Sequence, residues 1–153
     1  MTPSDFIIKA RTAAYQGMHI FPEYAVCEAA LESRFGNSEL AVKANNLFGQ
    51  KQSHAAIAIQ YPVLSLPTQE WDAGQMIVTT ANWPIFPDWP TSFMERMSLL
   101  HRLAPAYPHY ANALAAPDGE TFVREVSKTW STDPSRADKV LAIYSEYKEQ
   151  LYA

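Results

Sequence analysis

The sequence contains few of the features that mark a disulfide-rich, membrane-spanning or nucleic-acid-binding protein. Cys27 is its only cysteine, so no disulfide can form within the chain. No apolar run approaches about 18 residues, which excludes a transmembrane helix of ordinary length. No apolar segment follows a positively charged one at the start, so we expect no signal peptide in this chain. The formal net charge of −4 provides no basic field for nucleic acid or an anionic membrane.

Motifs for metal, phosphate and nucleophilic chemistry are also missing from the sequence. No glycine-rich phosphate loop occurs, and no serine stands in a recognisable pattern with histidine and aspartate. The histidines show no metal-ligand spacing, so we expect surface or helix-end positions for His19, His54, His101 and His109. We therefore expect neither a metal nor an organic cofactor. Cys27 lies in an apolar helical pattern without a basic neighbour, which predicts a buried, small apolar residue.

Length and composition predict a globular chain with its own hydrophobic core. The 153 residues are 48% apolar and 18% charged, a balance that excludes an intrinsically disordered chain. Helical spacing of apolar residues predicts helices over 3–16, 22–34, 38–43, 92–104, 108–114, 120–130 and 134–151. Thr2 is the expected N-cap of the first helix, and Asn37 or Ser38 that of the third. Gly17 and Gly36 are the expected helix stops.

Residues 54–83 interrupt the helical pattern and predict a small antiparallel insertion. Strand-like runs occur at 56–59, 63–66, 68–71 and 75–81. The last two flank Asp72-Ala73-Gly74, which is typical of a hairpin turn. Three prolines within 83–90 exclude a helix there and predict an aromatic loop. Ser92 and Glu95 then fit a capping box that opens the next helix.

The expected fold class is α+β and mainly α. Residues 1–153 form one helical domain with a small inserted antiparallel β-hairpin lobe, and the two lobes form a cleft. Ligand sites in proteins are concave and occur preferentially where two such parts meet. The cleft between the helical body and the hairpin is therefore the expected ligand site.

The most informative residue beside this cleft is Glu32, which ends a short apolar helix. Burial disfavours the charged form of a carboxyl group, so we expect Glu32 to be held as a neutral acid. Such a group can protonate the leaving oxygen of a glycosidic bond. Glu28 lies four residues earlier on the same helix face and is expected to be a solvated neighbour, whose charge helps to keep Glu32 protonated.

Residues 28–51 resemble the glucosaminidase family that cleaves bacterial peptidoglycan, glycoside hydrolase family 73. The family pattern Ala-Leu-Glu-Ser-x-aromatic-Gly-x-Ser-x-Leu-Ala-x-x-Ala-Asn-Asn-Leu-Phe-Gly-x-Lys is matched almost without a break over 30–51. Residues 68–74 match its hairpin pattern Thr-x-Glu-aromatic-x-x-Gly, and residues 131–139 resemble its segment Ala-Thr-Asp-Pro-x-Tyr-Ala-x-Lys. The resemblance implies a lysozyme-like fold and hydrolysis of the β-1,4 bond between N-acetylglucosamine and N-acetylmuramic acid.

The resemblance also implies roles for individual residues. Glu32 matches the general acid, and Glu70 matches the second carboxylate, which the family carries on its β lobe. A tyrosine that lines the family's cleft is replaced here by Trp130, which can stack on a sugar but has no phenol oxygen. The remaining candidates for substrate binding, for which turn formation or core packing is the alternative, are Asn46, Phe48, Tyr110, Trp83 and Trp89.

Other activities remain open at this point. A lytic transglycosylase or a muramidase would act on the same polymer, and a non-catalytic glycan-binding module would retain the cleft without turnover. The choice between a retaining, an inverting and a substrate-assisted mechanism also stays open. We expect a monomer that binds a peptidoglycan glycan strand and neither nucleic acid nor a membrane. Its place of action would be the bacterial cell wall, in the periplasm or outside the cell, with the route of export undetermined.

Overall fold

The computed structural model describes residues 1–52 and 61–153, apart from the side chains of Glu70 and Trp71. It is mainly helical with one two-stranded antiparallel sheet, which confirms the expected fold class. The elements along the chain are α1 (Pro3–Gln16), α2 (Pro22–Ser33), α3 (Glu39–Ala44), β1 (Val63–Asp72), β2 (Gln75–Pro84), α5 (Trp89–Leu103), α6 (Pro108–Leu114), α7 (Gly119–Trp130), α8 (Arg136–Glu146) and α9 (Lys148–Leu151).

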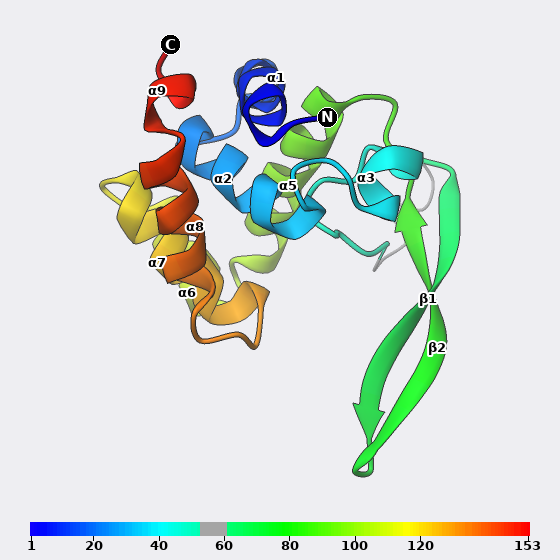
Figure 1. The fold of residues 1–153 in the computed structure, drawn as a ribbon. Helices are drawn as coiled ribbons and strands as arrows, with labels where there is room; N and C mark the ends of the chain where they lie inside the picture. The colour runs from blue at the N-terminus through cyan, green and yellow to red at the C-terminus, as the bar shows by residue number, and fades with distance from the viewer. Residues whose placement is uncertain (53–60) are drawn as a thin grey trace.

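Helix α2 lies inside the helical body and contacts α1, α7 and α8 (Figure 1). Its small residues Ala25, Ala29 and Ala30 are fully buried, so neighbouring helices can approach its backbone closely. Cys27 is also fully buried, and burial raises the pKa of its thiol, as expected for a residue of the core. Helix α2 therefore holds its last turn, which carries Glu32, in a fixed place.

The helix caps expected near the start of the chain are confirmed. The Thr2 hydroxyl accepts a hydrogen bond from the Asp5 backbone N–H, and α1 ends at Gly17. Ser38 caps α3 by accepting the Ala41 backbone N–H at 3.2 Å. These ends follow from short-range signals, because an N-cap side chain bonds a backbone group only two or three residues away.

The start of α5 differs from the prediction. We expected an aromatic loop over 83–90 and a helix from Ser92, but α5 begins at Trp89. Asp88 is the N-cap and accepts the Thr91 backbone N–H at 2.9 Å. Pro90 fits the first turn of a helix, where no backbone N–H is required. The capping box at Ser92 was therefore wrong, since that residue lies inside the helix and is buried.

The C-terminal helix is also divided, although a single helix over 134–151 was predicted. Asp133 caps a turn by accepting the Ser135 backbone N–H at 2.9 Å, and α8 begins one residue later, at Arg136. Tyr147 departs from helical geometry and separates α8 from α9. The later start places Arg136 at the first position of α8, which the site described below depends on.

The hairpin pairs β1 with β2, from Val63 opposite Pro84 to Asp72 opposite Gln75. Ala73 and Gly74 form the turn with positive φ, as in the tight turns favoured by hairpins. The predicted runs 63–66 and 68–71 belong to one strand, and the run 56–59, with the start of the predicted lobe at 54, lies outside the described residues. The hairpin extends away from the helical body, and its base lies near α3 (Figure 1).

Candidate active site

Glu32 lies in the last turn of α2, and its side chain is 26% exposed. The backbone turns sharply after it, because residues 34–36 all have positive φ. Ser33 fixes this turn: its hydroxyl donates to the Ala29 carbonyl at 2.6 Å and accepts the Gly36 backbone N–H at 2.9 Å. Positive φ is uncommon outside glycine, so the turn depends on such contacts to persist.

A groove of about 210 Å³ opens beside Glu32, between the helical body and the base of the hairpin. It is the cleft between two lobes that the sequence predicts. Its walls come from the end of α2, from α3 and the turn after it, and from both strands. The lining residues are Glu32, Ser38, Glu39, Leu40, Asn46, Gly49, Leu66, Pro67 and Trp83.

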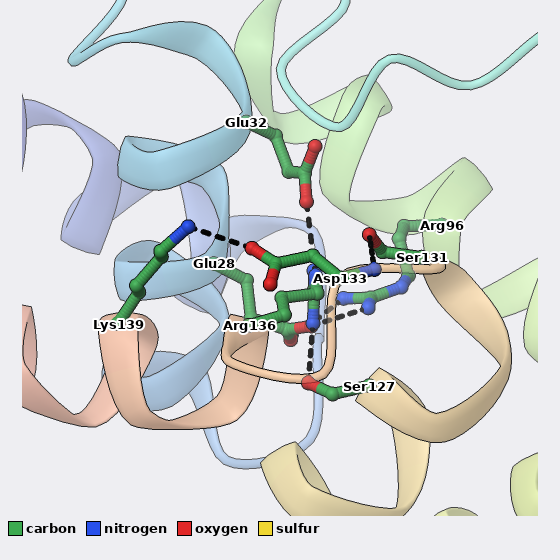
Figure 2. Close-up of polar contacts among 8 residues, drawn as sticks. All are labelled: Glu28, Glu32, Arg96, Ser127, Ser131, Asp133, Arg136 and Lys139. Carbon is green, nitrogen blue, oxygen red and sulfur yellow. Dashed lines mark hydrogen bonds and ion pairs between the residues drawn. The ribbon is translucent and has the colours of Figure 1, made fainter.

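The Glu32 carboxylate belongs to a chain of charged side chains that runs into the protein (Figure 2). Its Oε1 accepts a hydrogen bond from Nε of Arg136 at 2.9 Å. Nη1 of Arg136 contacts Oε2 of Glu28 at 3.0 Å and donates to the Ser127 hydroxyl at 2.8 Å. The two Glu28 oxygens also accept both terminal nitrogens of Arg96, at 2.9 and 2.7 Å. We call Glu28, Arg96, Arg136 and Glu32 the charged cluster.

Glu28 is fully buried, so the expectation of a solvated neighbour was wrong. Burial alone would raise the pKa of Glu28, but the charges of Arg96 and Arg136 and the Arg96 hydrogen bonds outweigh it and lower this pKa to about 2. Burial disfavours the charged form of Arg136 as well, yet the charges of Glu28 and Glu32 raise its pKa. Both groups are therefore charged at neutral pH.

His19 also contradicts the expectation of a surface position. It is buried, and its Nε2 lies 3.3 Å from Nη1 of Arg96. Burial, and then the charge of Arg96, lower the pKa of His19 to about 3, so the imidazole is neutral above that pH.

Aromatic side chains surround Arg96 inside the protein. The guanidinium carbon lies 4.5 Å from the Phe48 ring centroid and 4.4 Å from that of Trp130, within the range of cation–π attraction. Phe48 is 1% exposed and Tyr110 is 4% exposed. This burial favours packing over the direct sugar contact that the sequence suggests for these two residues. Trp130 is partly buried, and its ring packs against Arg96.

Asn46 closes the turn that follows α3. Its amide donates to the Gln50 carbonyl at 2.9 Å and accepts the Gln50 backbone N–H at 3.0 Å. Asn45 takes the left-handed conformation and donates to the Phe86 carbonyl at 3.0 Å. Next to them, the Leu47 backbone N–H donates to the hydroxyl of Ser92. Both asparagines thus shape the turn, although Asn46 also lines the groove.

The two candidate tryptophans lie in different places. Trp83, near the end of β2, lines the groove beside Glu32, and Nζ of Lys51 lies 5.6 Å from the centroid of its ring. Trp89 packs against Phe6, with ring centroids 5.2 Å apart, and borders a separate cavity of about 600 Å³ between α1 and the start of α5. The structure brings Trp83 to Glu32 and leaves Trp89 away from it.

Glu70 is placed by its backbone alone, because its side chain lies outside the described part of the structure. Its backbone pairs with Ile77 on the outer half of the hairpin. Pro67 lines the groove, and three residues of strand span roughly 10 Å, so the Glu70 backbone lies beyond the groove in this conformation. Glu39 lines the groove and pairs with Lys43 at 2.7 Å.

Sequence reasoning missed Arg96 and Arg136 entirely. A signal for Arg136 existed, since it occupies the tyrosine position of the pattern Asp-Pro-x-Tyr-Ala-x-Lys given above. No such signal marked Arg96 within its amphipathic helix. Within residues 1–52 and 61–153, no three His, Cys, Asp or Glu side chains gather in a way that could hold a metal ion.

Comparisons with known proteins identify the family of the chain. The family model described as "Glucosaminidase: Mannosyl-glycoprotein endo-beta-N-acetylglucosaminidase" matches residues 8–149. The chain is 30% identical over 135 residues to the exo-glucosaminidase LytG of Bacillus subtilis (strain 168), a match that covers 87% of this chain. The same match covers 46% of LytG, so the chain spans about half the length of that relative.

Solved structures share the fold. The catalytic domain of the autolysin Auto from Listeria monocytogenes has a TM-score of 0.80 at 23% identity, with 100% of this chain and 89% of that chain covered. A C-terminally truncated glycoside hydrolase domain of Salmonella typhimurium FlgJ has a TM-score of 0.72 at 22% identity, with 97% and 99% covered. The family match over nearly the whole sequence, together with this shared lysozyme-like fold, shows that the chain belongs to the glucosaminidase family, glycoside hydrolase family 73.

Proposed function

We propose that this chain hydrolyses the β-1,4 bond between N-acetylglucosamine and N-acetylmuramic acid in peptidoglycan, with Glu32 as the general acid. The observation that carries the proposal is the asymmetry of the Glu32 carboxylate. Its Oε1 is held by Arg136, whereas its Oε2 has no hydrogen-bond partner among the described residues. Because Glu32 lines the groove, Oε2 is the oxygen available to a substrate there.

In this mechanism the protonated Oε2 donates its proton to the glycosidic oxygen as the bond to the anomeric carbon breaks. The sugar passes through an oxocarbenium-like state, and water supplies the hydroxyl group that completes hydrolysis. Glu70 either activates that water or stabilises the positive charge, with or without help from the substrate's own acetamido group. Since its backbone lies beyond the groove, Glu70 acts only when the hairpin bends toward the helical body.

Trp83 is the proposed aromatic contact for a sugar, because it is 9% exposed and, unlike Phe48 and Tyr110, lines the groove. We propose that residues 1–153 act as one catalytic domain, as a monomer, on glycan strands of the bacterial cell wall. In the part of the chain that the structure covers, no helix is long and apolar enough to cross a membrane.

The test compares wild type, Glu32→Gln and Glu120→Gln on purified peptidoglycan sacculi. Glu120 is an exposed glutamate on α7, so its replacement makes the same chemical change away from the groove. We expect Glu32→Gln to clear sacculi at least a thousandfold more slowly while it keeps the wild-type melting temperature, and Glu120→Gln to match wild type.

Mass spectrometry of the released fragments identifies the bond. Reducing N-acetylglucosamine ends support the proposed activity. Reducing N-acetylmuramic acid ends would indicate a muramidase, and anhydro-muramoyl ends a lytic transglycosylase. Binding to sacculi without release of fragments would indicate a non-catalytic module, and normal clearing by Glu32→Gln would remove the assignment of the acid.

A further inference from the structure

We propose that Arg136 is a positioning residue for Glu32, one that directs Oε2 into the groove and keeps a positive charge beside the carboxyl group. The inference rests on the proposed function. It concerns a side chain that touches both the groove carboxylate and the buried carboxylate behind it.

The positioning argument follows from how Arg136 is held. It is 1% exposed and extends from the first residue of α8 toward α2. Nε binds Glu32, while Nη1 binds Glu28 and the Ser127 hydroxyl on α7. A planar guanidinium held at two of its nitrogens cannot rotate freely, so it fixes the direction of the Glu32 carboxylate. A catalytic group held in its productive geometry avoids the entropy cost of finding it.

The charge argument follows from the composition of the cluster. Two buried guanidinium groups, Arg96 and Arg136, face a single buried carboxylate, Glu28, whose oxygens already accept both terminal nitrogens of Arg96. Nε of Arg96 and Nη2 of Arg136 are buried with no partner among the described residues, so the cluster is short of acceptors. Oε1 of Glu32 supplies a further acceptor, which Nε of Arg136 binds at 2.9 Å.

Glu28 holds Arg136 on the side away from the groove. Its Oε2 lies 3.0 Å from Nη1 of Arg136, so the guanidinium is fixed between the two carboxylates. Replacing Arg136 with a neutral residue would remove the positive charge that lies between Glu28 and Glu32.

The other charged and titratable groups around Arg136 do not mask the effect of removing its positive charge. His19 is neutral above about pH 3, and burial raises the pKa of Tyr110, which stays neutral. Asp133 is paired with Lys139 at 2.7 Å on the exposed side of the turn before α8. Glu39, across the groove, is paired with Lys43. The groups that face Arg136 from each packed element are Glu28 and Glu32 on α2, Arg96 on α5, Ser127 on α7 and Tyr110 on α6.

The experiment measures kcat and KM on soluble glycan strands between pH 4 and pH 9. For Arg136→Gln we expect kcat to fall about tenfold or more at the optimum, with KM within twofold of wild type. We also expect the alkaline limb of the kcat profile to move up by about one pH unit, because a positive charge beside the acid has been removed. Arg124→Gln is the control, since Arg124 is half exposed on α7 and outside the cluster.

Arg136→Lys separates charge from geometry. Lysine keeps the positive charge but cannot bind Glu28 and Glu32 through a planar fork. We expect the alkaline limb to stay within about 0.3 pH units of wild type while kcat falls as in Arg136→Gln. Ser127→Ala, which releases Nη1 of Arg136, should lower kcat a few-fold and leave the limb in place. These two variants keep the test available if Arg136→Gln does not fold.

The inference would be overturned if Arg136→Gln, Arg136→Lys and Ser127→Ala all had the same kcat and the same alkaline limb as the control Arg124→Gln. A limb that moves equally in Arg136→Lys and Arg136→Gln would overturn the charge argument. The proposed function is tested separately by Glu32→Gln: if that variant retains activity, the acid itself has been wrongly assigned. If Glu32→Gln is inactive and the Arg136 variants keep the wild-type profile, only the role of Arg136 is lost.

Discussion

Replacement of Glu28 by glutamine tests whether the charged cluster holds the helical body together. The substitution keeps the shape of the side chain and removes a fully buried carboxylate that faces both Arg96 and Arg136. Breaking a buried ion pair by removing one partner costs about 3–5 kcal/mol, because the remaining charge stays buried without compensation. Total stabilities of domains are about 5–15 kcal/mol, so the loss would be a large part of the whole.

The lowered pKa of Glu28 gives a second, independent value for this loss of unfolding free energy. Its fall from an ordinary value of 4.5 to about 2 corresponds to about 3 kcal/mol, at roughly 1.4 kcal/mol per pKa unit. Because the folded pKa lies below the unfolded one, this stability is fully present above about pH 4.5. It is lost as the pH falls toward 2, where the folded protein must also take up the proton.

The assay is urea unfolding at a series of pH values between 7 and 2, followed by circular dichroism. At pH 7 we expect the free energy of unfolding of Glu28→Gln to lie about 3 kcal/mol below that of wild type, and the difference to shrink on acidification below pH 4.5. Glu120→Gln, the same change at an exposed position, should stay within about 0.5 kcal/mol of wild type throughout. A Glu28→Gln protein as stable as wild type at pH 7, or a difference that does not change with pH, would refute the reasoning.

Two further predictions concern the turn after Glu32 and the second carboxylate. Gly36→Ala should lower the free energy of unfolding, measured in urea, by about 1–3 kcal/mol. Gly36 has a φ of +79°, and an added Cβ would lie 2.9 Å from the Phe6 ring. An unchanged unfolding midpoint would contradict this prediction. Glu70→Gln should slow the clearing of sacculi by about a hundredfold or more, whereas Glu39→Gln should slow it by less than about tenfold. The reverse order would assign the role of second carboxylate to Glu39 instead of Glu70.

The first helices and the hairpin turn were predictable because their signals are local. Thr2 and Ser38 cap helices through backbone groups two or three residues away, and the Ala73-Gly74 turn is encoded within the hairpin itself. The errors arose where such signals compete. Three prolines suggested that 83–90 could not be helical, yet Asp88 and Pro90 together form a good helix start.

The place of Glu32 beside the groove was predictable from its motif, but the side chains that surround it were not. Nothing in the sequence shows that these charged residues pair, since Glu28 and Arg96 are 68 positions apart. Glu32 and Arg136 are 104 positions apart. A buried carboxylate four residues before the acid looks the same in the sequence as a solvated one. Only the packing of α2 against α7 and α8 removes that face from water.

The support of Glu32 comes from helices that are far apart in the sequence. Glu32 is on α2, the guanidinium that holds it is on α8, and the side chains that hold this guanidinium are on α2 and α7. A chain that has lost its C-terminal helices to local unfolding would still contain Glu32 but not the contact that orients it. Under the proposed function, proteolysis within α8 would therefore stop cleavage without cutting any residue that lines the groove.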